Sequence, residues 1–297
     1  MNEWVEILKT CGTCIENEPL SAHTTLGVGG PARWFFRPDN QAGLSTAMIC
    51  IPMQVPLLPL GRGSNLLPPD SGFPGVVLDL SGLNHIQVNE TQLHAECGVR
   101  MSRVTRICAD HGLTGLEFMA TVPGDIGGGV AMNAGAFGQQ VADCLTRIWV
   151  VRRDGEIEEL QAAQLEMSYR HTRLPHESLV VAAEFALQTT DGESVRERIR
   201  QMRTTRGRTQ PLDLPNCGSV FKNPPGDHAA RLIEAAGLKG HRIGGASISA
   251  KHANFIVNDD AALSSDVLAL IRLAQESVES RFGVRLEPEV RLLGEPS

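Results

Sequence analysis

The chain has 297 residues and a formal net charge of −7, and its 42% hydrophobic and 21% charged residues are typical of a soluble protein of two or three domains. The acidic balance argues against nucleic-acid or anionic-membrane partners, and no run approaches the ~20 apolar residues of a membrane span. Thirty glycines and a single tyrosine are the unusual counts.

The N-terminal region has two features that bear on compartment and redox chemistry. Residues 1–6 are acidic, with no basic stretch leading into an apolar core, so we expect no secretory signal. Cys11 and Cys14 form a CxxC pair, but no strand precedes it and no second pair completes a metal site. We therefore interpret them as ordinary thiols. Seven scattered cysteines indicate no disulfide framework, and we predict a reducing cytoplasmic location and no metal.

Strand-like and helix-like segments alternate irregularly along the chain. The predicted strands are Trp34–Arg37, Val76–Leu80, Ile148–Arg152 and Leu179–Leu187. One helix is predicted over 100–111, ending at Gly112, and another over 264–281, ending before Gly283. In the second helix Val267, Ile271, Ala274 and Val278 fall on one stripe. This mixture favours an α+β fold over a regular βαβ sheet.

A change in composition near residues 192–216 indicates a domain boundary. Six arginines crowd a helical stretch between 196 and 208, and Pro211 and Pro215 follow. The prolines stop a helix. We interpret the arginines as a solvated helix face rather than a phosphate site.

Three glycine-rich segments could bring backbone N–H groups against a phosphate: Thr24–Pro31, Gly61–Leu67 and the region 112–138, which holds eight glycines. The second segment is not a Rossmann fingerprint, because it lacks the third glycine and Pro68-Pro69 disfavour a following helix. No P-loop sequence occurs.

Three polar segments are candidates for chemistry. Gly218–Pro224 places Ser219 beside a glycine, but the GxSxG elbow of a serine hydrolase is absent. Residues 286–292 alternate, which predicts a strand with Glu287, Glu289 and Arg291 on one face. Tyr169-Arg170 could grip a carboxylate or merely cap a surface. Taken alone, the Ser219 segment is more often a turn, and the face with Glu287 and Arg291 is more often a solvated strand.

Together, these segments closely resemble the UDP-N-acetylenolpyruvoylglucosamine reductase family, in its order, over residues 24–293. The matching segments are Thr24–Gly30, Gly61–Leu67, Gly115–Phe118, Pro123–Gly128, Asn133–Gly138, Tyr169-Arg170, Gly218–Pro224, Arg231–Gly237, Gly244–Asn258 and Glu287–Arg291. Gly218–Pro224 is highly specific, whereas the glycine segments alone would indicate only the wider flavin-binding superfamily.

The resemblance implies a two-lobed FAD-binding domain of the vanillyl-alcohol oxidase and p-cresol methylhydroxylase type, followed by an α+β substrate domain. We expect lobe 1 at 1–82, lobe 2 at 83–205 and the substrate domain at 206–297, with the last strand able to return to lobe 1. The length fits the family's shorter sub-group. By resemblance the protein is a monomer.

The resemblance implies non-covalent FAD and NADPH as the hydride donor, with the FAD pyrophosphate on Gly61–Leu67 and Pro123–Gly128. The cofactor-binding residues implied are Gly61, Arg62, Gly63, Ser64, Asn65, Leu66, Pro123, Gly124, Gly127, Gly128, Asn133, Gly135 and Gly138.

The substrate implied is a nucleotide sugar, UDP-N-acetylglucosamine enolpyruvate, reduced to UDP-N-acetylmuramate for peptidoglycan. By resemblance Arg170 and Glu289 steady an enolate, and Ser219 gives the final proton. The substrate-binding positions are Tyr169, Lys222, Asn223 and Arg291.

Several positions depart from the family pattern: His23, Arg62, Pro68-Pro69, Asp125 and Phe137. Asp125 stands where Thr or Ser is frequent and would bring a negative charge near the pyrophosphate, and we hypothesise that Arg62 offsets it. The alternatives are another flavin oxidoreductase of the superfamily and a non-catalytic protein that binds flavin or nucleotide sugars.

Overall fold

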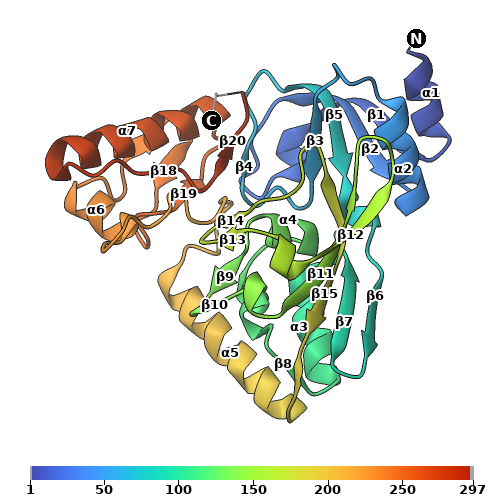
Figure 1. Cartoon of the computed structure of the whole chain (residues 1–297). Coiled ribbons are helices and arrows are strands. Elements are labelled where there is room, and N and C mark those ends of the chain that lie inside the picture. Colours follow the sequence, from blue (N-terminus) through green and yellow to red (C-terminus); the bar gives the residue numbers. More distant parts are fainter. Residues whose placement is uncertain (1, 295–297) are drawn as a thin grey trace. The chain divides into compact units, whose positions relative to one another are not determined.

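The computed structural model describes residues 2–294, which form two compact units (Figure 1). Unit 1 comprises residues 2–16, Trp34–Arg62 and Gly75–Thr205, and unit 2 comprises Asn17–Arg33, Gly63–Pro74 and residues 206–294. Each unit is therefore assembled from segments distant in sequence. The division at residues 82 and 205 stays a prediction, although Arg206 does begin the last segment of unit 2.

Unit 1 holds most of the regular structure. Its helices are α1 (Glu3–Lys9), α2 (Gln41–Cys50), α3 (Met101–Asp110), α4 (Ile126–Ala131) and α5 (Gly192–Thr209), whose last residues enter unit 2. Its strands, of which β1, β2 and β5 also extend into unit 2, are β1 (Gly12–Pro19), β2 (Pro31–Pro38), β3 (Leu57–Leu60), β5 (Phe73–Asp79), β6 (Ile86–Asn89), β7 (Gln92–Glu96), β8 (Leu113–Thr114), β9 (Gly135–Ala136), β10 (Gln139–Gln140), β11 (Leu145–Val151), β12 (Ile157–Gln161), β13 (Met167–Ser168), β14 (His171–Thr172), β15 (Leu179–Ala186) and β16 (Gln188–Thr189).

Two sheets organise this unit. The larger is antiparallel, in the order β12-β11-β15-β7-β6, and the other runs β1-β2-β5-β3 with β3 parallel to β5. The core on the larger sheet includes Phe118 and Phe185, both fully buried, and Ile126 and Val130 of α4 join it. The short helix α4, on which a proposed cofactor segment lies, is thus held by apolar burial.

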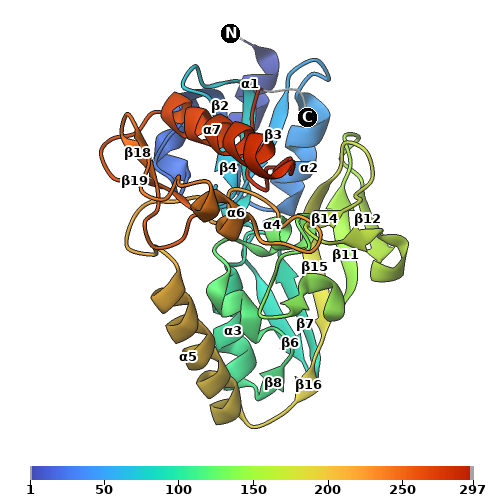
Figure 2. The ribbon, with the colours of Figure 1, turned by 90° about the vertical axis from the view of Figure 1, so that its left-hand side faces the viewer.

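Helix α5 lies beside α3 in unit 1 (Figure 2). Ala109 of α3 and Val195 and Ile199 of α5 form a small buried cluster. Arg198 pairs with the buried Glu117 at 3.0 Å, and Arg196 pairs with Asp110 at 2.9 Å. Two arginines of α5 are therefore held by ion pairs within unit 1, whereas burial lowers the pKa of Arg206 to about 10, so that residue departs from the expected solvated face.

Unit 2 is built around one long helix. It contains β4 (Leu66–Leu67), α6 (Ala229–Ala235), β17 (Arg242–Ile243), β18 (Ala246–Ile248), β19 (Ile256–Asn258), α7 (Ser264–Phe282) and β20 (Arg291–Leu292). The strands β17-β18-β19 form an antiparallel sheet, and β20 pairs in parallel with β4. The predicted stripe of α7 is confirmed, because Val267, Ile271, Ala274 and Val278 are all buried in this core.

The local predictions are largely confirmed. The strands predicted near 34, 76, 148 and 179 correspond to β2, β5, β11 and β15, and the two predicted helices to α3 and α7. Gly112 and Gly283 end these helices with φ of 62° and 68°, the left-handed conformation that a terminal glycine adopts freely. The mixed, mainly antiparallel architecture confirms the α+β prediction. Between residues 2 and 294, no helix is long and apolar enough to cross a membrane.

Candidate functional site

The segment that carries Ser219 is held inside unit 2 by one buried asparagine. Asn254 is 4% exposed; its side chain accepts a hydrogen bond from the Phe221 N–H at 2.9 Å and donates one to the Phe221 carbonyl at 2.8 Å. Its backbone carbonyl accepts from the Val220 N–H at 2.9 Å. Ser219 itself is half-buried. The two bonds to Phe221 fix the backbone that immediately follows the serine.

Asn254 is a residue that sequence reasoning missed. It lies within the matching segment Gly244–Asn258, but an asparagine in a polar loop gives no sequence sign that it is buried or that it bonds a segment 33 residues away. Only the fold reveals it as a positioning residue for Ser219.

We expect Asn254→Leu to lower the free energy of unfolding by about 2–4 kcal/mol, because it leaves the N–H and C=O of Phe221 unpaired in the interior. Urea unfolding of the full chain would measure this loss. The exposed Asn84 provides the control, since Asn84→Ala should change stability by less than about 0.5 kcal/mol. Equal losses in the two variants would show that Asn254 does not hold this segment.

Glu289 lies beside the serine segment in unit 2. The N–H of Glu289 donates to the Val220 carbonyl at 2.8 Å, and the N–H of Lys222 donates to the Glu287 carbonyl at 2.9 Å. The structure therefore brings the segments of two predicted catalytic residues, Ser219 and Glu289, together. Sequence spacing alone could not show this.

The predicted continuous strand at 286–292 is wrong. The described chain has only an isolated bridge between Pro288 and Phe221 and the two-residue β20. The burial alternation is partly present, with Leu286 and Val290 buried and Glu287 and Arg291 exposed. The bridge uses the N–H groups of Lys222 and Glu289 and needs none from Pro288, and pairing does not extend beyond it.

Two of the three predicted substrate-binding residues of unit 2, Lys222 and Asn223, have side-chain contacts within the unit. Lys222 pairs with Glu287 at 2.5 Å. The side-chain oxygen of Asn223 accepts a hydrogen bond from the Ala229 N–H at 3.1 Å, at the start of α6. Arg291 is exposed. Lys222 would therefore have to exchange or share its ion pair in order to bind an anionic substrate.

The glycine segment Gly61–Leu66 divides between the units after Arg62. Gly61 and Arg62 are exposed in unit 1, whereas Gly63 and Leu66 are buried in unit 2 and Ser64 is half-buried. Asn65 donates from its side-chain amide to the Glu289 carbonyl at 3.0 Å, and its own carbonyl accepts from the Arg291 N–H at 3.0 Å. In unit 2, Asn65 thus links the glycine segment to the backbone of the predicted acid.

Arg170 occupies a two-residue turn of unit 1. Ser168 of β13 pairs with His171 of β14, which leaves Tyr169 and Arg170 between the strands, and Arg170 has a φ of 58°. Its guanidinium donates to the Gly135 carbonyl at 2.9 Å and lies 5.0 Å from the Tyr169 ring centre. The turn is anchored to α4, because the Thr172 hydroxyl donates a hydrogen bond to the Val130 carbonyl at 2.6 Å.

Asn133 also supports this turn. Its side chain is buried and donates to the Ser168 carbonyl at 2.9 Å and to Gln140 at 3.0 Å, and it accepts from the Ala142 N–H at 3.0 Å. These bonds engage its side chain within the protein. A cofactor contact by Asn133 would therefore come from its backbone.

The segment Pro123–Gly128 has glycines with different surroundings. A Cβ on Gly127 would lie 2.9 Å from the Cys97 Cβ, so this glycine permits close packing inside unit 1. A Cβ on Gly128 would meet no atom of the described chain within 4 Å, and the same holds at Gly138, which is in the turn between β9 and β10. These open backbone positions fit a ligand lying directly on the chain, as the predicted FAD site requires.

Asp125, in the same segment, has a buried carboxyl group. The residue is 4% exposed, and neither side-chain oxygen has a hydrogen-bond partner among residues 2–294. Burial raises the pKa of this carboxyl to about 6, although Arg62 and Arg100 act to lower it. Burial outweighs both arginines in the chain without FAD, and the hypothesis that Arg62 offsets Asp125 at the pyrophosphate stays a prediction.

The cysteines match the interpretation of ordinary thiols. All seven are unpaired; burial is the first cause that raises the pKa of Cys11 and Cys14 above the usual thiol value, and it raises that of Cys217 to about 12. A reactive thiol requires the opposite shift. Among the described residues no group of three or more His, Cys, Asp or Glu could hold a metal ion.

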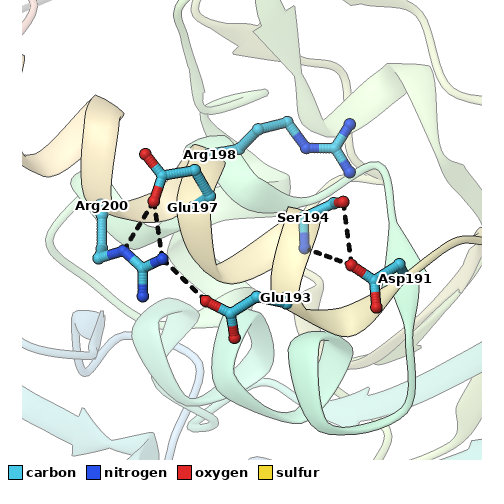
Figure 3. A pocket seen from close by; sticks show the side chains of 6 residues that line it. All are labelled: Asp191, Glu193, Ser194, Glu197, Arg198 and Arg200. Carbon is cyan, nitrogen blue, oxygen red and sulfur yellow. Dashed lines mark hydrogen bonds and ion pairs between the residues drawn. The ribbon is translucent and has the colours of Figure 1, made fainter.

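A surface cavity on α5 contains none of the predicted site residues (Figure 3). Arg200 pairs with Glu193 at 2.8 Å and with Glu197 at 2.7 Å, and Asp191 accepts from the N–H of Ser194 at 2.9 Å. Arg198 has its own partner in Glu117. Because these charges are paired on an exposed helix, the cavity is a solvated helix face, as expected from the arginine run.

Comparison with known proteins identifies both parts of the chain. Residues 210–293 match the C-terminal domain of UDP-N-acetylenolpyruvoylglucosamine reductase, and residues 32–161 match an FAD binding domain. A UDP-N-acetylenolpyruvoylglucosamine reductase of Methylococcus capsulatus is 44% identical over 288 residues, which cover 96% of this chain and 94% of that protein. The chain belongs to the UDP-N-acetylenolpyruvoylglucosamine reductase family.

Two further relatives agree with this membership. A reductase of the same name from Alkalilimnicola ehrlichii is 44% identical over 94% of each chain. The crystal structure of the enzyme from Thermus caldophilus superposes with a TM-score of 0.81 at 33% identity, covering 95% of this chain and 98% of that one. The family resemblance is confirmed, as is the FAD-binding domain of an oxidoreductase. The roles of individual residues stay predictions.

Proposed function

We propose that this chain reduces UDP-N-acetylglucosamine enolpyruvate to UDP-N-acetylmuramate, with FAD as bound cofactor and NADPH as hydride donor. The observation that carries the proposal is the 44% identity to a reductase of that name over 96% of the chain. The product serves peptidoglycan synthesis. We also propose that the protein works as a cytoplasmic monomer that holds FAD without a covalent bond.

The proposed chemistry is hydride transfer: FAD held on the two glycine segments would supply a carrier for the hydride that passes from NADPH to the terminal carbon of the enol ether. Reduction at that carbon leaves negative charge on the neighbouring carbon, which is conjugated with the substrate carboxylate. We assign Arg170 to this charge. Its guanidinium is held by the Gly135 carbonyl and the anchored turn, so little reorganisation is needed when the charge develops.

We assign Ser219 as the proton donor and Glu289 as the acid that shares the stabilisation of the enolate. A serine hydroxyl is a weak acid, but an enolate carbon is a strong base, so the proton can pass if the geometry is enforced. Support comes from the bonds of Asn254 to Phe221 and of Glu289 to Val220, which hold both segments in unit 2.

The remaining assignments concern binding. Tyr169, Lys222, Asn223 and Arg291 bind the substrate, with Lys222 and Arg291 supplying positive charge for an anionic nucleotide sugar. FAD lies on the residues predicted from the two glycine segments, and the open backbone at Gly128 and Gly138 supports this placement.

The test is an assay of the purified full chain. We expect a flavin absorption spectrum and NADPH oxidation that depends on the enolpyruvyl nucleotide, with one UDP-N-acetylmuramate formed per NADPH consumed. Steady NADPH oxidation without the nucleotide would instead indicate another flavin oxidoreductase of the superfamily. Absence of flavin and of turnover would indicate a non-catalytic binding protein.

A further inference from the structure

The carboxyl group of Asp125 is a buried polar group that the proposed reaction does not use. Asp125 precedes α4, yet its side chain makes no capping hydrogen bond to that helix, and neither of its oxygens has a partner among residues 2–294. A buried polar group without a partner is costly, so it calls for a ligand or a change of protonation.

The backbone around Asp125 is firmly held, which fixes where the carboxyl can point. The Asp125 carbonyl accepts from the Gly129 N–H at 2.9 Å, and the residue forms a bridge with Arg100. A Cβ built on Gly61 would lie 2.9 Å from the Asp125 Oδ2. The carboxyl of Asp125, which belongs to Pro123–Gly128, therefore lies against the backbone of Gly61, so in unit 1 it brings the two segments predicted to hold the pyrophosphate together.

The charged and titratable groups around this carboxyl do not neutralise it by contact. Arg62 and Arg100 favour its ionised form from exposed positions, whereas Asp79 favours the protonated form. Asp79 is itself paired with Arg37 at 2.6 Å. The neighbouring Cys97 thiol is buried with its pKa raised, so it adds no negative charge. The effect of burial on the pKa of Asp125 is larger than the opposing effect of the two arginines, so the carboxyl is easily protonated.

An ionised carboxylate at this place would repel the pyrophosphate of FAD, since both phosphates are anionic and the carboxyl itself is buried away from water. A protonated carboxylic acid would instead offer an O–H donor to a phosphate oxygen. We propose that Asp125 is a cofactor-binding residue that takes up one proton from solvent when FAD binds and donates a hydrogen bond to the pyrophosphate. The proposal rests on the cofactor placement given under the proposed function, and no covalent bond forms or breaks.

The consequence is a cofactor affinity that depends on pH in a defined direction. Without FAD the carboxyl releases its proton as pH rises through about 6. Above that pH each binding event must recapture a proton, so the dissociation constant should increase by about tenfold per pH unit until the carboxyl of the bound form also ionises. Below pH 6 the affinity should level off.

The experiment measures FAD binding to the full chain after the flavin has been removed. Flavin fluorescence titrations at pH 5.5, 6.5 and 7.5 should show at least a tenfold weakening from the lowest to the highest pH. Calorimetry at pH 7.5 in two buffers with different ionisation enthalpies should detect uptake of about one proton per FAD.

Two neutral variants and one matched control isolate Asp125. In Asp125→Asn and Asp125→Ser the affinity should vary by less than about twofold over this pH range, and proton uptake should vanish. Asp110, an exposed acid of α3 in the same unit, provides the control, and Asp110→Asn should keep the full pH dependence. Because the two substitutions differ in size, one variant can still test the role of Asp125 if the other misfolds.

An equal pH slope in the wild-type chain and in Asp125→Asn, or no proton uptake in the wild-type chain, would overturn the proposal. The titrations contain neither NADPH nor the nucleotide sugar. If the chain forms UDP-N-acetylmuramate but binds FAD with the same affinity at all pH values, the proposed proton uptake by Asp125 is wrong and the proposed function is unaffected. A chain with the predicted slope but no product refutes the function alone.

Discussion

Replacing Ser219 with alanine should lower the rate of UDP-N-acetylmuramate formation by about 10²–10⁴-fold while NADPH still reduces the flavin at the wild-type rate. The size follows from the usual contribution of a positioned proton donor. Flavin reduction should be unaffected although product formation is slowed, because the proton assigned to Ser219 is needed only after the hydride has reached the substrate. Stopped-flow absorbance of the flavin in the two half-reactions, with product measured by mass spectrometry, would separate them.

The structure predicts that this variant folds normally. Ser219 is half-buried, and the hydrogen bonds that fix its segment are made by the N–H groups of Gly218 and Val220 and by both backbone groups of Phe221. The alanine variant retains all of these bonds. A loss of activity can therefore be attributed to the hydroxyl, provided that urea unfolding shows no change in stability.

Ser265, an exposed serine at the start of α7 in the same unit, is the matched control. Ser265→Ala should form product at the wild-type rate. The assignment of Ser219 would be abandoned if Ser219→Ala formed product at the wild-type rate. It would also be abandoned if the flavin-reduction step slowed as much as product formation did.

Replacing Arg170 should produce the second large effect. We expect Arg170→Ala to lower kcat by about 10²–10³-fold, which is the usual effect of removing one group that stabilises developing negative charge. Arg170→Lys keeps the positive charge but loses the planar fork and the reach to the Gly135 carbonyl, so its loss should be smaller yet still clear. Reduction of the flavin by NADPH should be unchanged in both.

The position of Arg170 makes the two variants comparable. Its φ of 58° lies in the left-handed region, where alanine, lysine and arginine all have a Cβ and experience similar strain. A difference in kcat between the variants therefore reports the side chain rather than the turn. Circular dichroism of both variants would verify that the turn and its surroundings remain folded.

Arg173 offers a control three residues away. It pairs with Glu166 at 3.0 Å, and both side chains are at least 70% exposed, so this pair adds little to stability. Arg173→Ala should keep kcat within about twofold of the wild-type value. A loss in Arg173→Ala equal to that in Arg170→Ala would show that general positive charge, and not the placed guanidinium, supports the reaction.

Local features of the fold were predictable from the sequence because they depend on neighbouring residues. The apolar stripe of α7 repeats at helical spacing, and Gly112 and Gly283 follow their helices as terminal glycines do. The prediction of a continuous strand at 286–292 was wrong. Leu286 and Val290 are buried as the alternation predicts, but the segment has only one isolated bridge before the two-residue β20, so alternation alone does not establish a partner strand.

Features of the site that depend on distant contacts could not be predicted. Asn254 bonds a segment 33 residues before it, and Asn65 bonds Glu289 across 224 residues. Neither residue is distinguished by its immediate neighbours in the sequence. Hydrogen bonds of this kind form only when the chain folds back on itself, since a side-chain amide has no preferred partner until burial removes water as a competitor.

The family and the α+β class could be recognised from the residues alone, and the proposed catalytic residues and glycine-rich cofactor segments were predicted from them. That Asp125 is buried without a partner against Gly61, and that Ser219 and Glu289 are held on adjoining segments of unit 2, became visible only in the folded chain. Residue type sets local conformation and chemical capacity. Burial, which controls the cost of a charge and the pKa of Asp125, depends on which distant segments surround it.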